Sequence, residues 1–180
     1  GAQLEQNSYA TSYIPTSGTT QTRVAETCGG AGDSSSINSE EGVLYFEGSL
    51  LNDNGTASDI SINDNTPANN RLILSCSSTT NNITARFDSS GSDITLNAIG
   101  LDLTLSHKIA LSYKLNNISL WVDGVKKDSS NSFTVFSNLV NVDFLNPFSG
   151  GVNIFYGNTE DLRVYNTALS DSELQALTTL

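Results

Sequence analysis

Side chains alternate between apolar and polar through the middle of this 180-residue chain. Ile109, Leu111 and Tyr113 fall on one side of an extended backbone, and the same period resumes after an Asn116-Asn117 turn. Because successive side chains of a strand point to opposite faces, this period indicates strands with one face against a core. The Asp123-Gly124 pair that follows is typical of a tight hairpin turn. The sequence therefore predicts a meander of three strands, over 107–115, 117–123 and 125–128.

Similar short runs of aliphatic, β-branched and aromatic residues recur along most of the chain. They lie at 42–51, 58–62, 71–76, 82–87, 94–99, 133–136, 140–145, 152–156 and 161–165. The loops between them are rich in Ser, Asn, Gly and Asp, and a chain with 26 Ser and 20 Asn is poorly suited to an all-α fold. About a dozen short strands with frequent turns are typical of a sandwich of two sheets.

One short helix is predicted near the C-terminus. Ser170 and Glu173 have the spacing of a capping box, in which each side chain accepts a hydrogen bond from the backbone N–H of the other residue. Leu169 and Leu174 flank this box as a hydrophobic staple. Leu174 and Leu177 then share one face, so we expect the helix to pack against the sandwich.

The charge balance excludes one large class of partner. Eight Lys and Arg against 19 Asp and Glu give a formal net charge of −11, and the chain has no basic run. Nucleic acid would therefore be repelled over most of the surface. No apolar run approaches the roughly 18 residues of a membrane span, so no membrane insertion is predicted. The acidity favours solubility or, alternatively, cation binding.

The N-terminal residues differ from the rest of the chain. Residues 1–25 are predicted to be an extended arm or a linker from a preceding module, and residues 26–180 a single sandwich domain. Because no initiator Met or signal peptide opens the chain, we expect it to be part of a longer or processed protein. Cys28 and Cys76 fit no metal or redox spacing, which leaves either one disulfide or two inert thiols.

Two segments resemble one fold family. The run Asp161-Leu162-Arg163-Val164-Tyr165-Asn166-Thr167-Ala168-Leu169-Ser170 and the capped helix after it resemble the C-terminal signature of concanavalin A-like domains of the laminin-G type. The segment Leu120-Trp121-Val122-Asp123-Gly124 resembles the hairpin of that family that ends in Val, Asp or Asn, and Gly. This resemblance implies an all-β fold: a concanavalin A-like jelly-roll sandwich of two antiparallel sheets with one short C-terminal helix.

The N-terminal segment carries a second resemblance. Gln3-Leu4-Glu5, Tyr9-Ala10-Thr11-Ser12-Tyr13-Ile14-Pro15-Thr16 and Thr22-Arg23-Val24-Ala25 resemble a segment of bacteriophage tail-fibre and related virion or adhesin proteins. There it joins a carbohydrate-binding-module-like domain to a concanavalin A-like one. The resemblance implies a receptor-binding role on a virion surface or outside the cell, and a homo-oligomer, a trimer if the protein is a tail fibre.

Catalytic constellations are missing from the sequence. Glycosidases on this scaffold need two carboxylates on one strand, and no E-x-D-x-x-E occurs. The chain has a single His, His107, so a Ser-His-Asp triad or a multi-histidine zinc site is nearly excluded. A lone histidine at the start of a strand is more often structural than a proton shuttle. We therefore predict that the chain is not an enzyme.

Calcium is the metal that the acidic loops suit best. It takes six to eight oxygen ligands from carboxylates, amides and backbone carbonyls, and several Asp/Asn clusters supply them. The candidate ligands are Asp53, Asp59, Asp88 and Asp93. None of these clusters matches an EF-hand loop, and each is more typical of a solvated turn than of a calcium site.

Two places are candidates for sugar binding. Trp121 is out of phase with Leu120 and Val122, so it faces away from the core near Asp123 if the strand is regular. There it would either offer a platform to a sugar ring or pack against a neighbouring strand or subunit. Tyr156 and Asn158, near a loop end, form the second candidate.

These observations favour a non-catalytic carbohydrate-recognition or receptor-binding module of a phage tail or virion appendage, with a cell-surface glycan as its partner. Two alternatives remain open at this level. One is a purely structural domain of a virion or assembly, and the other is a binding module of a secreted bacterial polysaccharide-degrading enzyme.

Overall fold

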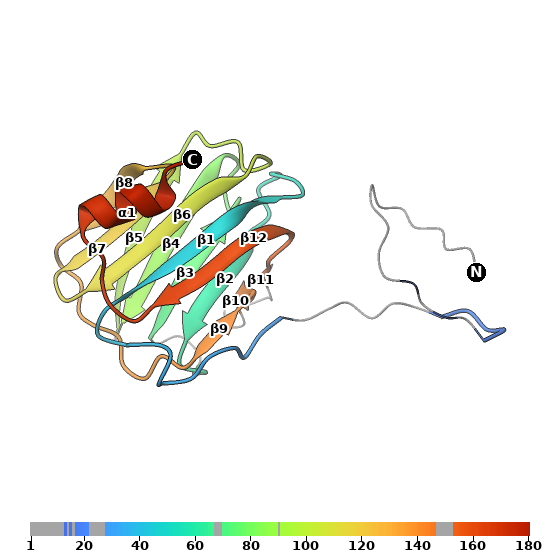
Figure 1. Ribbon diagram of the computed structural model, residues 1–180, viewed down its shortest axis with the longest axis horizontal. Helices are drawn as coiled ribbons and strands as arrows, with labels where there is room; N and C mark the ends of the chain where they lie inside the picture. The colour runs from blue at the N-terminus through green and yellow to red at the C-terminus, as the bar shows by residue number, and fades with distance from the viewer. Residues whose placement is uncertain are drawn as a thin grey trace.

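The protein is described here from a computed structural model, which covers residues 13, 15, 17–21, 28–66, 70–89, 91–146 and 153–180. Almost all regular structure in these residues is β, with one short helix (Figure 1). The elements, in chain order, are β1 (Gly42–Leu50), β2 (Ser58–Asn63), β3 (Arg71–Cys76), β4 (Asn82–Ser89), β5 (Ser92–Ile99), β6 (His107–Lys114), β7 (Asn117–Val122), β8 (Val125–Ser130), β9 (Asn141–Asp143), β10 (Leu145–Asn146), β11 (Asn153–Ile154), β12 (Gly157–Tyr165) and α1 (Asp171–Thr178).

Two five-stranded antiparallel sheets form the sandwich. The first sheet has the order β12-β1-β6-β7-β8, and the second has the order β5-β4-β3-β2-β9. Strands β10 and β11 make a separate two-stranded ladder. The predicted meander is present as β6, β7 and β8, and the turn between the last two places Asp123 and Gly124 at positive φ, as a tight hairpin requires. The prediction of an all-β jelly-roll sandwich with a C-terminal helix is confirmed.

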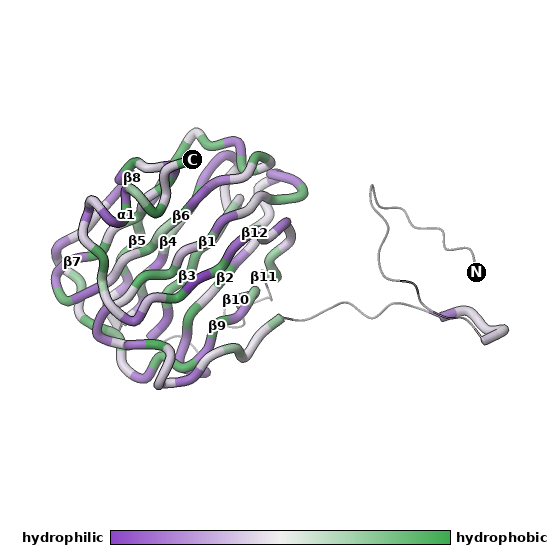
Figure 2. The backbone as a smooth tube through the Cα atoms, viewed as in Figure 1, coloured by the Kyte–Doolittle hydropathy of each residue, from purple (hydrophilic) through white to green (hydrophobic). Residues whose placement is uncertain are grey.

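The core lies between the sheets because each strand alternates its side chains. In β2, Ile60 and Ile62 are fully buried against the opposite sheet, while Asp59 and Ser61 point to the other face. The same alternation gives Figure 2 its change from hydrophobic to hydrophilic along the strands. Phe46 and Phe87 are among the largest buried side chains of this core.

Helix α1 begins where the capping box predicts. The Ser170 hydroxyl accepts a hydrogen bond from Glu173 N at 3.4 Å, and Glu173 Oε2 accepts one from Ser170 N at 2.8 Å. Leu174 is buried on the outer face of the first sheet, where it packs with Tyr45 and Trp121 in a second, smaller apolar cluster. The helix therefore covers part of that face.

Removing the cap should cost a measurable part of the stability. We expect Ser170→Ala to lower the free energy of unfolding by about 1 kcal/mol, because the N-terminal backbone donors lose their acceptor. Urea denaturation followed by circular dichroism measures this change. Gln175→Ala, at an exposed position of the same helix, is the control and should stay within about 0.5 kcal/mol of the parent. Equal stability of Ser170→Ala and the parent would contradict the prediction.

Three predicted strands are absent, divided or shortened in the structure, and two others begin earlier than predicted, at Gly157 for 161–165 and at Ser92 for 94–99. Residues 133–136 form no strand: Phe133 and Phe136 lie in the loop between β8 and β9 and pack edge to face at 4.9 Å between centroids. Their spacing of three puts both rings in the core, which the period of a strand would not do. The run 140–145 divides into β9 and the start of β10, and in the described part of the run 152–156, residues 153–156, only Asn153–Ile154 is a strand.

The segment before β1 lies along the edge of the second sheet. Ala31 pairs with Val142 of β9, and Phe144 N donates to Cys28 O at 3.0 Å. Most of the predicted arm, residues 1–25, lies outside the described residues, so the predicted boundary near residue 26 stays a prediction. In the described part of the chain, no helix is long and apolar enough to cross a membrane.

Both cysteines are free, Cys28 exposed and Cys76 buried. Burial raises the pKa of the Cys76 thiol to about 12, so this group stays protonated near neutral pH. The interpretation as two thiols rather than one disulfide is confirmed. A protonated, buried thiol is a poor nucleophile, which agrees with a structural role for Cys76.

Candidate functional site

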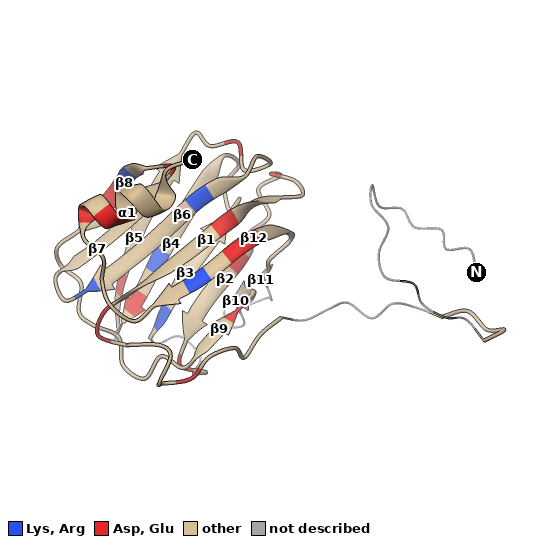
Figure 3. Ribbon diagram, viewed as in Figure 1, with Lys and Arg blue, Asp and Glu red and all other residues tan. Residues whose placement is uncertain are grey.

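The outer faces of the two sheets differ. The outer face of the first sheet is partly covered by α1, whereas that of the second sheet carries polar side chains on every strand. Over β4 and β5 these side chains reach solvent: Asp93, Thr95 and Asn97 are exposed, and Thr84 and Arg86 are partly exposed. We call this set of five residues the β4–β5 face. Figure 3 shows that basic and acidic residues are interspersed over the strands instead of forming separate patches.

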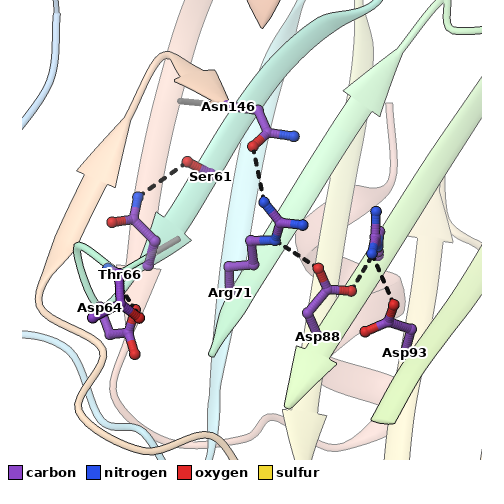
Figure 4. A network of polar contacts seen from close by, with 9 residues as sticks. Ser61, Asp64, Thr66, Arg71, Asp88, Asp93 and Asn146 are labelled. Carbon is purple, nitrogen blue, oxygen red and sulfur yellow. Dashed lines mark hydrogen bonds and ion pairs between the residues drawn. The ribbon is translucent and has the colours of Figure 1, made fainter. Parts of the chain in front are cut away.

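An ion-pair network joins three strands at one end of this face. Arg71 Nε of β3 donates to Asp88 Oδ2 of β4 at 2.6 Å, and Arg86 Nε donates to the other oxygen of Asp88 at 2.6 Å. Arg86 Nη2 then reaches Asp93 Oδ2 of β5 at 2.8 Å. Figure 4 shows Arg71, Asp88 and Asp93 side by side across the strands. The network is buried at one end and open at the other, since the exposed side-chain fraction is 6% for Arg71 but 55% for Asp93.

Burial and charge act in opposite directions on Asp88. Burial is the strongest influence and raises the pKa of its carboxyl above the ordinary value, while Arg71 and Arg86 oppose the rise. For Arg86, burial lowers the pKa, but Asp88 and Asp93 together raise it above the ordinary value. Arg86 is therefore a permanent cation held between two carboxylates.

The paired strands β10 and β11 lie against β2 on the outer face of the second sheet. Ser61 Oγ donates to Leu145 O at 2.7 Å, and Asn153 Nδ2 donates to Asp59 Oδ2 at 3.1 Å. Ser61 and Asp59 are consequently buried although they lie outside the main core. Among the described residues, the polar side chains of β4 and β5 are therefore the most exposed on this outer face, and Ser75 of β3 and Asn141 of β9 are only partly exposed.

Two of the predicted calcium ligands are engaged with the protein's own donors. Asp53 accepts hydrogen bonds from Ser77 Oγ at 2.6 Å and from Asn81 N at 2.7 Å. Asp59 accepts from Ser75 Oγ at 2.6 Å in addition to the Asn153 amide. In the described residues, no group of three or more His, Cys, Asp or Glu side chains is placed to hold a metal ion.

The other two predicted ligands, Asp88 and Asp93, do come together. They are direct partners in the ladder of β4 and β5. Arg86 lies between their carboxylates, and a cation there would be repelled by the guanidinium. The structure therefore pairs these carboxylates with arginine, and calcium binding stays a prediction.

Trp121 lies on the opposite side of β7 from Leu120, as its phase predicts, but α1 covers it. Only 5% of its surface is exposed, its Nε1 donates to Ser119 Oγ at 3.1 Å, and Lys126 Nζ lies 5.1 Å from the ring centroid. A sugar ring cannot stack on an indole that Leu174 already covers. Its burial speaks against the interpretation as a sugar platform. The indole packs under α1 of its own chain, where the alternative expected a neighbouring strand or subunit.

Asp123, the residue predicted to accompany Trp121, holds a turn. Its Oδ2 lies 2.7 Å from His107 Nδ1, and its Oδ1 accepts from Lys108 N at 3.0 Å. The second ring nitrogen of His107 lies 3.0 Å from Asp102 O. Both imidazole nitrogens thus have structural partners, which agrees with the structural role predicted for this histidine.

Tyr156 lies just before β12 and Asn158 lies near its start, and both are exposed. The Tyr156 side chain is 60% exposed, and its backbone oxygen accepts from Leu51 N at 3.3 Å. Asn158 lies opposite Ser49 in the ladder with β1. Asn158 belongs to the first sheet and Tyr156 to the segment just before it, so the structure does not place either residue on the β4–β5 face.

Sequence analysis alone did not select Arg86, Thr95 or Asn97. A signal was present, because Asp88 comes two residues after Arg86 and shares its face if the predicted strand 82–87 continues by one residue. What the sequence did not contain was the pairing of β4 with β3 and β5, which brings Arg71 and Asp93 to them. In the structure β4 continues to Ser89 and β5 begins at Ser92, so Asp88 and Asp93 lie in strands and not in the predicted acidic loop.

Solved structures with a similar fold include a domain of a sialidase and a domain of an arabinanase. The CBM40 domain of the Ruminococcus gnavus IT-sialidase has a TM-score of 0.66 and 18% identity, over 87% of this chain and 98% of that one. The same domain bound to α2,3 sialyllactose has a TM-score of 0.65 and 18% identity, over 87% of this chain and 97% of that one. A third structure is Domain 4 of AbnA, a GH43 extracellular arabinanase from Geobacillus stearothermophilus, in complex with arabinotriose. It has a TM-score of 0.61 and 15% identity, over 79% of this chain and 68% of that one.

No family model matches the chain, and no curated protein matches it by sequence. At the identities above, the similarity establishes the fold, a jelly-roll sandwich. None of the similar structures named above is a phage tail-fibre protein.

Proposed function

We propose that this chain is a non-catalytic glycan-binding module whose site is the β4–β5 face. The observation that carries the proposal is the contrast between the two outer faces: that of the first sheet is partly covered by α1, and that of the second presents exposed polar side chains over two strands. A flat row of polar groups on rigid strands suits an extended ligand that is itself polar along its length.

The chemistry of the face fits a sugar. Each hydroxyl of a sugar both donates and accepts, so a binding surface needs donors and acceptors within a few ångströms of each other. Arg86 and Asp93 supply one such pair, held 2.8 Å apart. Thr84 and Asn97 supply another across the same two strands, with Thr84 Oγ1 3.3 Å from Asn97 Oδ1.

The same contacts support binding without catalysis. Glycoside hydrolysis needs two carboxylates on either side of the scissile bond, one of them protonated or free to attack. Asp88 and Asp93 are both held by Arg86, and Asp88 is buried. The similar domains named above are parts of a sialidase and an arabinanase, and the complexes with sialyllactose and arabinotriose favour a glycan as the ligand class.

Arg86→Ala should weaken glycan binding by tenfold or more, because it removes the charged donor at the centre of the face. Tenfold corresponds to about 1.4 kcal/mol, within the range for one charge-assisted hydrogen bond. Asp88 keeps Arg71 as a partner, so the variant should fold. Isothermal titration calorimetry with a glycan that binds the parent measures the change.

Arg163→Ala is the matched control. Arg163 is also an exposed arginine paired with an aspartate, Asp161, but it lies on β12 of the first sheet. If both variants lose affinity equally, the site is not on the β4–β5 face. If neither loses affinity, the sugar binds elsewhere, and Tyr156 becomes the next residue to replace.

A glycan array on the purified chain is the first experiment, with calcium in one arm and a chelator in the other. Signals in both arms support the proposal and show that binding does not need calcium. Signals only with calcium support the predicted metal beside the sugar. A blank array in both arms, with the protein folded by circular dichroism, would overturn the proposal and favour a structural virion or assembly role.

The setting of the module is a narrower proposal. The resemblance of residues 3–16 to phage tail-fibre proteins supports a virion appendage and a trimer, with the virion surface or the extracellular space as its location. The similar domains of secreted and glycan-active enzymes favour, with equal weight, a module of a bacterial polysaccharide-degrading enzyme. Light scattering after size exclusion distinguishes these: a trimer supports the first setting, and a monomer the second.

A further inference from the structure

The charge arrangement of the β4–β5 face bears on which glycans it can take. The network holds two guanidinium and two carboxylate groups, Arg71, Arg86, Asp88 and Asp93, and their formal charges cancel. Its buried end is closed, since Arg71 and Asp88 are within the protein, and only Arg86 and Asp93 reach a ligand. A ligand therefore meets one cation and one anion together.

A carboxylated sugar would meet an obstacle at this pair. Its natural partner is Arg86, and the side of that guanidinium which faces β5 is already taken by Asp93 at 2.8 Å. The incoming carboxylate would lie next to Asp93 or would have to displace it, and like charges at such distances repel. The whole chain, with a net charge of −11, adds to this repulsion at long range.

An uncharged sugar meets no such obstacle. The guanidinium has five N–H groups, and in the described residues two carboxylate contacts engage it, which leaves N–H donors for hydroxyl oxygens. Asp93 is 55% exposed and accepts from hydroxyl protons. Thr95, the ladder partner of Arg86, and Asn97 continue the face with uncharged donors and acceptors.

From this arrangement we infer that the β4–β5 face binds neutral oligosaccharides and discriminates against sugars that carry a carboxylate, with Asp93 as the residue that sets this specificity. The inference rests on the proposed function, because it concerns the same site. It assigns Asp93 a role beyond contact with the sugar: Asp93 places a negative charge beside the N–H groups of Arg86 to which a ligand carboxylate would bind.

An array that prints neutral oligosaccharides beside sialylated and uronic-acid-containing ones tests the inference on the unmodified chain. Signals confined to neutral glycans are expected. Signals that require the carboxylate would overturn the inference and leave the proposed function standing. A blank array on both halves would overturn the proposed function itself, and the inference with it.

The sharper test is Asp93→Asn, which keeps the shape of the side chain and releases Arg86 from one carboxylate. We expect this variant to gain binding to α2,3-sialyllactose of tenfold or more over the parent, measured by titration calorimetry at low ionic strength with lactose as the neutral reference. Glu160→Gln removes the same charge from an exposed position on β12 and should gain nothing. An equal gain in both variants, or none in Asp93→Asn, would overturn the role of Asp93.

Discussion

Asp88→Ala is expected to lower the free energy of unfolding by about 3–5 kcal/mol, because it leaves a buried cation without its partner. Arg71 has only 6% of its side chain exposed and donates through Nε to Asp88 at 2.6 Å. In the part of the chain that the structure describes, its other side-chain contact is with Asn146 Oδ1, at 3.4 Å, which is longer and is made to an uncharged group. Water cannot replace the carboxylate at this depth, so the desolvation cost of Arg71 stays uncompensated.

Thermal and urea denaturation measure this loss, and Asp93→Ala is the matched control. Asp93 also pairs with an arginine of the network, but its side chain is 55% exposed. Exposed ion pairs contribute about 1 kcal/mol or less, so this control should remain nearly as stable as the parent. Two variants of equal stability would show that the buried part of the network does not hold β3 and β4 together.

Trp121→Ala is expected to cost about 3–5 kcal/mol of stability and to leave the intrinsic affinity for glycans unchanged. The indole fills the space between α1 and the first sheet, where it packs with Val43, Tyr45, Ala110 and Leu174. Truncation to Ala leaves a cavity there, and α1 loses the surface that holds it. The β4–β5 face lies on the other sheet, and the ion pairs of Arg86 and Asp93 involve no residue of the Trp121 cluster.

A second variant separates stability from binding at this position. Trp121→Phe retains a ring under the helix and should lose less stability than Trp121→Ala, while both bind glycan as the parent does at temperatures where they are folded. Calorimetric titration beside a melting curve tests this. A loss of affinity in Trp121→Phe without a loss of melting temperature would restore the tryptophan as a sugar platform.

Much of the fold follows from local patterns. The capping box at Ser170 and Glu173, the Asp123-Gly124 turn and the alternation in β6 and β7 each concern neighbouring residues. Such interactions act over a few bonds, so the residue order alone shows them. The prediction of a strand at 133–136 was wrong. Phe133 and Phe136 lie in a loop, and both side chains point into the core, so the segment does not alternate as a strand does.

The candidate site was predictable only in part. Arg86 and Asp88 share a face by simple alternation, but Arg71 and Asp93 come from other strands. The phase of Trp121 placed it on the opposite face from Leu120, which is where it lies. That phase carried no information about whether the face is open to solvent, and α1, some fifty residues later in the chain, covers it.

The sequence by itself determined the class of fold, most strand positions, the helix and its cap, because these depend on side-chain period and on hydrogen bonds between near neighbours. Only the tertiary structure decided which outer face is open and which charges meet on it. Those outcomes depend on pairings such as β1 with β12, whose strands lie far apart in the chain. Residue order leaves such partners unspecified, since every antiparallel strand offers the same backbone donors and acceptors to any other.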